Sequence, residues 1–101
     1  MLKRTHHCGE LSKSNIHNII VLNGWVNAIR LHGQVVFIDL RDRYGKTQIV
    51  FDLNSFKGDF ESVKKLSIED VLAVKGVVRA RSNSAINPDI KTGEIEVLIS
   101  N

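Results

Sequence analysis

The sequence predicts a small all-β domain with one short helix, and three observations support this prediction. In five separate segments, hydrophobic residues alternate with polar or small residues, which is the repeat of a half-buried strand. Between residues 58 and 67, the spacing of Phe60, Val63 and Leu66 approaches the helical repeat instead. A chain of 101 residues can bury one core but cannot hold a catalytic domain as well.

The first strand is predicted over residues 19–30. Strict alternation along it places Leu22, Val26 and Arg30 on one side of the strand and Trp25 and its neighbours on the other. Gly24 lies within the segment, where a glycine commonly marks a bend in a strand.

Two further strands are predicted over residues 34–42 and 46–52. Turn-forming residues around Gly45 separate them, so the first three strands form a meander. Val36, Ile38 and Leu40 give the second strand a purely aliphatic face, and Phe37 stands on the opposite face.

The second half of the chain predicts a helix and two more strands. Asp59 is a suitable N-cap for a helix within residues 58–67. Strands follow over residues 71–81, where one face becomes basic at its far end, and over residues 94–99. Three strands, a helix and two strands is the order of a five-stranded OB-fold Greek-key barrel, a fold that commonly binds oligonucleotides. Another small β-barrel would fit the same order.

Composition and local motifs argue against several other classes of protein. The net charge of +3 and the pI near 9.2 permit a polyanionic partner without requiring one. No apolar run is long enough to span a membrane or to form a signal peptide, so we expect a cytoplasmic protein with no membrane partner. The single Cys8, beside His6 and His7, gives too few ligands for a metal site. With no catalytic signature and no phosphate-binding loop, we expect no catalytic residue, metal or cofactor in this chain.

One aromatic and several polar residues are candidates for nucleic-acid binding. Phe37 could stack on a base, since it lies opposite an aliphatic face; alternatively, a loop or neighbouring domain covers it. Arg30, Arg79 and Arg81 lie at strand ends or away from the core, where a guanidinium can reach phosphates or base edges or can simply be solvated. Gln48 can donate to and accept from a base edge.

The remaining candidates have weaker support. Glu96 could accept hydrogen bonds from amino groups of exposed bases, although solubility explains a strand carboxylate equally well. Asn83 and Asn87 lie in a loop where asparagine usually serves the turn. His32 lies beside Gly33, where it could contact RNA or only belong to the turn.

Several stretches of the chain resemble the start of bacterial-type aspartyl-tRNA synthetases. They follow the order and spacing of that family and cover nearly the whole chain: residues 4–11 (RTHHCGEL), 22–26 (LNGWV), 37–43 (FIDLRDR), 48–52 (QIVFD), 76–81 (GVVRAR) and 92–97 (TGEIEV). The last stretch looks more specific to the aspartyl type than to the related asparaginyl and lysyl enzymes.

The resemblance implies that residues 1–101 form one anticodon-binding domain of a longer class II synthetase. The complete enzyme would be a homodimer that uses ATP and Mg²⁺ in a catalytic domain absent from this chain, and this domain would hold no cofactor. Its partner would be the anticodon loop of tRNA, and the fragment alone would be non-catalytic.

The resemblance also implies roles for the candidate residues. Phe37 would stack on the middle anticodon base, a uridine, and Gln48 would hydrogen-bond the edge of that base. Arg30, Arg79 and Arg81 would contact the backbone and bases of the loop. Glu96, Asn83 and Asn87 would lie near the outer anticodon positions. His32 and Ser84 lie in loops that could tune the choice between aspartate and asparagine tRNAs.

The chain departs from this family in one place. Where many relatives carry consecutive arginines after the Trp-Val pair, residues 27–30 read Asn-Ala-Ile-Arg. We therefore expect weaker and less salt-sensitive RNA binding than in an arginine-rich relative. Two other functions stay open on the residues alone: a generic single-stranded nucleic-acid-binding OB domain, and a barrel that binds protein or supports a dimer.

Overall fold

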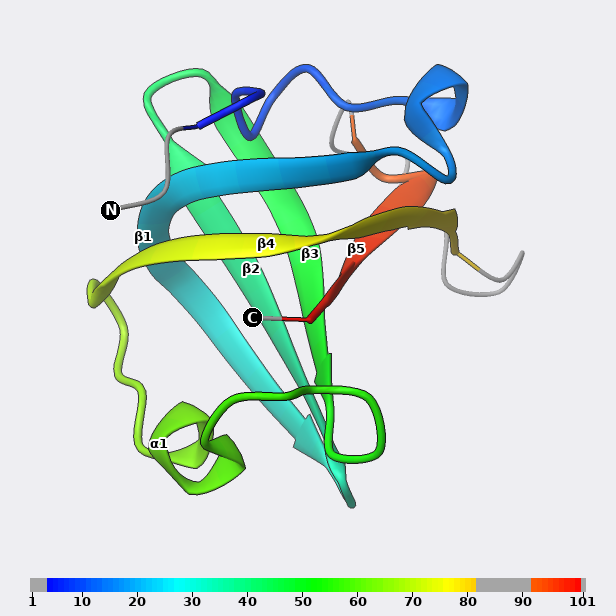
Figure 1. The fold of residues 1–101 in the computed structure, drawn as a ribbon. Helices are drawn as coiled ribbons and strands as arrows, with labels where there is room; N and C mark the ends of the chain where they lie inside the picture. Colours follow the sequence, from blue (N-terminus) through cyan, green and yellow to red (C-terminus); the bar gives the residue numbers. More distant parts are fainter. Residues whose placement is uncertain (1–3, 82–91, 101) are drawn as a thin grey trace.

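The computed structural model describes residues 4–81 and 92–100, which form a closed five-stranded barrel with short helical segments (Figure 1). The elements are η1 (Lys13–Asn15), β1 (Ile19–His32), β2 (Val35–Asp42), β3 (Gly45–Asp52), α1 (Phe60–Lys64), β4 (Val71–Ala80) and β5 (Ile95–Ile99). The five predicted strands and the predicted helix are thereby confirmed, with strand ends that differ by at most a few residues.

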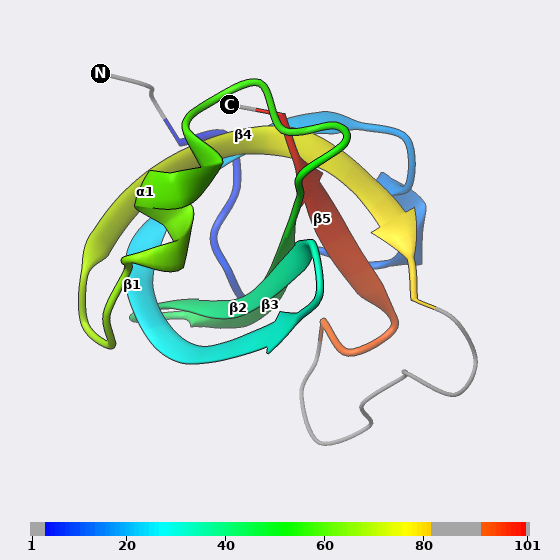
Figure 2. The same ribbon diagram turned by 90° about the horizontal axis from the view of Figure 1, so that it is seen from below.

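The strands are ordered β1-β2-β3-β5-β4, and β4 pairs again with β1 to close the barrel (Figure 2). β1 takes part in two ladders, because its first half pairs with β4 and its second half with β2. All pairs are antiparallel except β3 with β5, whose register aligns Ile49 with Val97 and Val50 with Leu98. This arrangement confirms the OB barrel predicted from the order of the elements.

A β-bulge interrupts β1, so the strict alternation predicted for that strand does not continue through its whole length. Val26 pairs with Leu40 of β2, but the next aligned pair is Ala28 with Asp39, so Asn27 is the extra residue. Beyond the bulge the two faces are exchanged, and Arg30 aligns with Phe37 on the outside of the barrel. The prediction that Arg30 shares a side with Leu22 and Val26 was therefore wrong.

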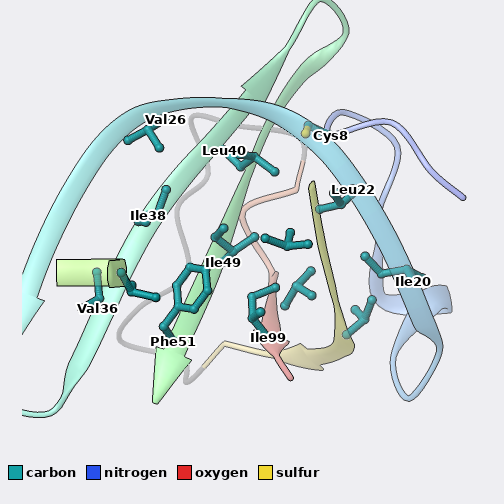
Figure 3. Close-up of a cluster of buried hydrophobic side chains, with 14 of the residues drawn as sticks. Cys8, Ile20, Leu22, Val26, Val36, Ile38, Leu40, Ile49, Phe51 and Ile99 are labelled. Carbon is teal, nitrogen blue, oxygen red and sulfur yellow. The ribbon is translucent and has the colours of Figure 1, made fainter. Parts of the chain in front are cut away.

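The interior of the barrel is filled by aliphatic side chains from all five strands (Figure 3). The alternating residues predicted for the aliphatic face of β2 are fully enclosed there, as are those of β5. The largest of the enclosed side chains are Leu11, Ile20, Leu22, Ile38, Leu40, Ile49, Ile95 and Ile99. Because the apolar residues of each strand face this core, the polar residues between them face outward.

Different segments cover the two ends of the barrel (Figure 1). At one end, α1 is capped by the Asp59 carboxylate, which accepts from the backbone N–H of Glu61, and it contributes Phe60 and Val63 to the core. Near the other end, the segment before η1 carries Cys8 and Leu11 into the core. The predicted N-cap of the helix is confirmed.

The segment around Cys8 is fixed to the turn between β2 and β3. The backbone N–H of Cys8 donates to the Asp42 carboxylate at 2.8 Å, and the Thr47 hydroxyl donates to the Cys8 carbonyl. A Cβ on Gly9 would lie 2.2 Å from the carbonyl oxygen of Tyr44, so only glycine fits at this crossing. These contacts give the RTHHCGEL stretch a structural role.

We predict that the Cys8 thiol is unreactive in the folded protein. Burial, and then the charge of Asp42, raise its pKa from 9.0 to about 12, so the thiolate population near pH 8 is about a thousandfold smaller than in the unfolded chain. Iodoacetamide labelling followed by mass spectrometry should be at least about a hundredfold slower in buffer than in denaturant. Similar rates in both conditions would show that this end of the barrel is open.

Candidate nucleic-acid interface

Phe37 lies on the outer wall of the barrel, as its alternation with the aliphatic residues of β2 predicts. Its neighbours Val36 and Ile38 are enclosed in the core, whereas Phe37 is half-buried and lies outside the core cluster. The ring of His32 meets it edge to face, with centroids 5.8 Å apart and planes at 78°. Phe37 is therefore a supported aromatic side chain on the outer surface, with part of its area accessible to a stacking partner.

Beside Phe37, five polar side chains form a continuous chain of hydrogen bonds around the wall, which we call the polar row. Each strand contributes one residue, in the order of the strands in the barrel: Arg30 (β1), Asp39 (β2), Gln48 (β3), Glu96 (β5) and Arg79 (β4). Four of these five were predicted as site residues. Asp39 was not.

Each hydrogen bond in the polar row has a defined donor and acceptor. Arg30 binds Asp39 with two hydrogen bonds, from Nη1 to Oδ2 at 3.3 Å and from Nη2 to Oδ1 at 3.0 Å. Nη2 of Arg30 also donates to Oε1 of Gln48 at 3.0 Å. Nε2 of Gln48 donates to Oε1 of Glu96 at 2.9 Å, and Nε of Arg79 donates to Oε2 of Glu96 at 2.6 Å.

Burial differs along the polar row: the two central side chains are buried, and the arginines at its ends are partly exposed. Gln48 and Glu96, in the middle, retain 7% and 8% of their surface. The side chains of Arg30 and Arg79, at the ends, are each 43% exposed, and that of Asp39 is 21% exposed. The central groups are thus held rigidly, while both cations remain open to an anionic ligand.

A second line of side chains runs parallel to the polar row and is mainly apolar. Phe37 aligns with Val50 across β2 and β3, Val50 with Leu98 across β3 and β5, and Leu98 with Val77 across β5 and β4. Val50 is enclosed, but Phe37, Leu98 and Val77 keep part of their surface exposed. An apolar track beside a hydrogen-bonding row suits a ligand with flat rings and polar edges.

Arg81 differs from the other two candidate arginines. It was expected to lie outside the core with its guanidinium free of burial, but only 8% of its surface is exposed and its Nε donates to the Ile95 carbonyl at 2.9 Å. Burial lowers the pKa of Arg81, while Glu96 and Asp39 act to raise it. The expectation of an accessible guanidinium was therefore wrong, although this charge belongs to the same electrostatic cluster as the polar row.

The other predicted site residues divide into two groups. His32 is exposed and packs against Phe37, at the end of β1. Asn83, Ser84 and Asn87 lie outside the described residues. Asp39 was not among the predicted site residues, although its alternation with Phe37 already placed both on one side of the strand.

Across the described residues 4–81 and 92–100, no three potential metal ligands come together. Within the same residues, no helix has the length and apolar character needed to cross a bilayer.

We predict that Glu96 supports the folded wall as well as the polar row. Glu96→Ala leaves the buried Gln48 amide and the Arg79 guanidinium without their acceptor, which should lower the free energy of unfolding by about 1–3 kcal/mol. The matched control is Glu94→Ala, because Glu94 pairs with Lys13 on the exposed surface and should contribute less than about 0.5 kcal/mol. Urea denaturation measures both values; equal losses would contradict a structural role for Glu96.

Comparison with known proteins agrees with this fold. Residues 20–101 match the family described as OB-fold nucleic acid binding domain. The chain is 51% identical over 100 residues to an aspartate–tRNA(Asp/Asn) ligase of Caldanaerobacter subterraneus subsp. tengcongensis, covering 99% of this chain and 17% of that protein. It is 49% identical over 94 residues to the ligase of the same name from Salinibacter ruber, covering 93% of this chain and 15% of the relative.

A solved structure shows the same architecture. The asparaginyl-tRNA synthetase from Pyrococcus horikoshii superposes with a TM-score of 0.82 at 28% identity, over 100% of this chain and 22% of that one. The chain therefore spans about one sixth of the ligases that it matches and about one fifth of this solved synthetase. The matched residues include all five barrel strands apart from the first residue of β1, and the chain belongs to the family of OB-fold nucleic acid binding domains.

Proposed function

We propose that this chain reads the anticodon loop of tRNA as one domain of a longer aspartate–tRNA ligase. The observation that carries this proposal is the half-buried Phe37 on the outer wall, directly beside the polar row. Anticodon bases are unpaired and can be splayed onto an aromatic ring, and their edges can then be read by neighbouring polar groups. The similarity to aspartate–tRNA(Asp/Asn) ligases supports the choice of tRNA as the ligand.

In this proposal, each part of the site has a different task. Phe37 stacks on the middle base, and Gln48 hydrogen-bonds the edge of that base. Arg30 and Arg79, the two exposed cations, attract the phosphates of the loop. Glu96, the buried carboxylate, orients Gln48 and Arg79, and Arg81 adds positive potential from below the surface.

The chemistry of the whole protein lies outside this domain. We propose that a class II catalytic domain, following this one, uses ATP and Mg²⁺ to join aspartate to tRNA, that the complete enzyme is a homodimer, and that it acts in the cytoplasm. Residues 1–101 would serve as its anticodon-binding domain, with a non-catalytic role. This division is supported by the small share of the related ligases that the chain covers.

The stacking role of Phe37 predicts a loss of binding in Phe37→Ala. An aspartate anticodon stem-loop should bind the variant more weakly by about 1–3 kcal/mol, because base-on-aromatic stacking is lost. Phe37→Tyr should keep most of the affinity, since it retains the ring. Tyr44→Ala removes another exposed aromatic, in the turn between β2 and β3, and should change little.

Titration calorimetry with this stem-loop and with a scrambled loop tests the proposal. An unchanged affinity in Phe37→Ala would remove Phe37 from the site. Equal affinity of the unaltered chain for both loops would instead support a generic single-strand binder, and no binding of either loop would favour a barrel that binds protein.

The departure from the arginine-rich relatives predicts a gain of salt dependence in Ala28→Arg. Beyond the bulge, Ala28 aligns with Asp39 on the outer wall, so the new guanidinium lies beside the polar row. The slope of log affinity against log salt should steepen by about 0.7 for each added phosphate contact to a single-stranded loop. Ala73→Arg, at an exposed position of β4 next to α1, adds the same charge elsewhere and should change the slope less. Equal slopes for the two variants would contradict this position of the loop.

A further inference from the structure

We propose that Asp39 is a positioning residue that fixes the orientation of the Gln48 amide and thereby decides which middle base is accepted. This inference rests on the proposed anticodon-reading function. Asp39 was not among the site residues predicted from the sequence, and the inference gives it a role in specificity that does not require contact with RNA.

Asp39 restrains the guanidinium group of Arg30. The carboxylate takes both terminal nitrogens of the guanidinium, at 3.3 Å and 3.0 Å, which is the paired geometry that restrains a planar fork most strongly. Because 43% of the Arg30 side chain is exposed, these hydrogen bonds are a main restraint on its direction. Asp39 therefore sets the direction in which the remaining Arg30 hydrogen-bond donors point.

Arg30, in turn, fixes the orientation of the Gln48 side-chain amide. A side-chain amide can rotate by half a turn with little change in shape, and its orientation is set by its hydrogen-bond partners. Arg30 can only donate, and it faces Gln48 at 3.0 Å; Glu96 can only accept, and it faces Gln48 at 2.9 Å from the other side. Only one orientation satisfies both partners, with Oε1 toward Arg30 and Nε2 toward Glu96.

The oriented Gln48 amide keeps hydrogen-bonding capacity for a base. After these two contacts, the amide keeps one lone pair on Oε1 and one hydrogen on Nε2, in a fixed order. The edge of uridine offers an acceptor at O4 and a donor at N3, whereas cytidine offers a donor at N4 and an acceptor at N3. A fixed amide matches one of these patterns only, and an amide that can rotate matches either.

Asp39 has a second, opposite effect on RNA binding. Its negative charge offsets the positive charge of Arg30 at the surface where an anionic ligand would approach. Removing that charge should strengthen non-specific attraction to RNA while it weakens discrimination between bases. A residue with a merely structural role would not change these two quantities in opposite directions.

The test compares two stem-loops that differ only in the middle anticodon base, uridine or cytidine. In Asp39→Asn, we expect the preference for uridine to fall by about tenfold, while the affinity for the cytidine loop stays the same or rises and its salt slope steepens by up to about 0.7. Glu61→Gln, on the exposed surface of α1, makes the same change in net charge and should leave the preference intact.

A second variant guards against a folding defect in Asp39→Asn. Arg30→Lys keeps the net charge but lacks the fork that can hold Asp39 and Gln48 together, so the preference should fall similarly without a steeper salt slope. Thermal unfolding identifies any variant that is not folded. If both folded variants retain the full preference for uridine, the inference is wrong.

Gln48→Ala separates action through the amide from direct contact with RNA. In this background the preference should already be low, and adding Asp39→Asn should reduce it no further. An additional loss would show that Asp39 acts on the RNA itself and would overturn the inference. The proposed function is judged separately, because it fails if the unaltered chain does not distinguish the anticodon loop from a scrambled loop.

Discussion

The pairing of β3 with β5 is the constraint on which both the core and the polar row depend. These strands run parallel, and their register aligns Ile49 with Val97 inside the barrel and Val50 with Leu98 outside it. Without this closure, β3 would have an open edge and the interior would be exposed on that side. The same pairing brings Gln48 within 2.9 Å of Glu96, although they are far apart in the chain.

The physical character of the polar row favours selectivity over raw affinity. Its two arginines face two carboxylates, so the row itself carries little net charge despite the excess of +3 over the whole chain. Its central hydrogen bonds are buried, which makes them strong and makes an unpaired group there unfavourable. A ligand that leaves one of these groups unsatisfied loses binding energy, and a matching ligand does not.

The stretches that carry the resemblance to aspartyl-tRNA synthetases include residues that hold the barrel together and residues of the polar row. Residues 4–11 fasten one end of the barrel through Cys8, which is enclosed and hydrogen-bonded to Asp42. In residues 92–97, the Thr92 hydroxyl donates to the Lys46 carbonyl and ties the entry of β5 to β3, whereas Glu96 joins the polar row. A family signature can therefore contain residues that hold a surface in place and residues that form it.

Much of this protein follows from the sequence alone. Alternating apolar residues predict the five strands, and Asp59 predicts the start of α1. The aliphatic neighbours of Phe37 in β2 predict its place on the outer wall. These features depend on interactions between residues close in the chain or on one strand's own repeat, which periodicity reports directly.

The tertiary structure decided which polar groups meet. The bulge at Asn27 turned Arg30 outward, and strict alternation gave no sign of it because a single extra residue exchanges the faces of a strand. The burial of Arg81 and the hydrogen bonds of Asp39 depend on neighbours from other strands. Such contacts are fixed by the closed order of the strands and their register, and these depend on how the whole barrel packs.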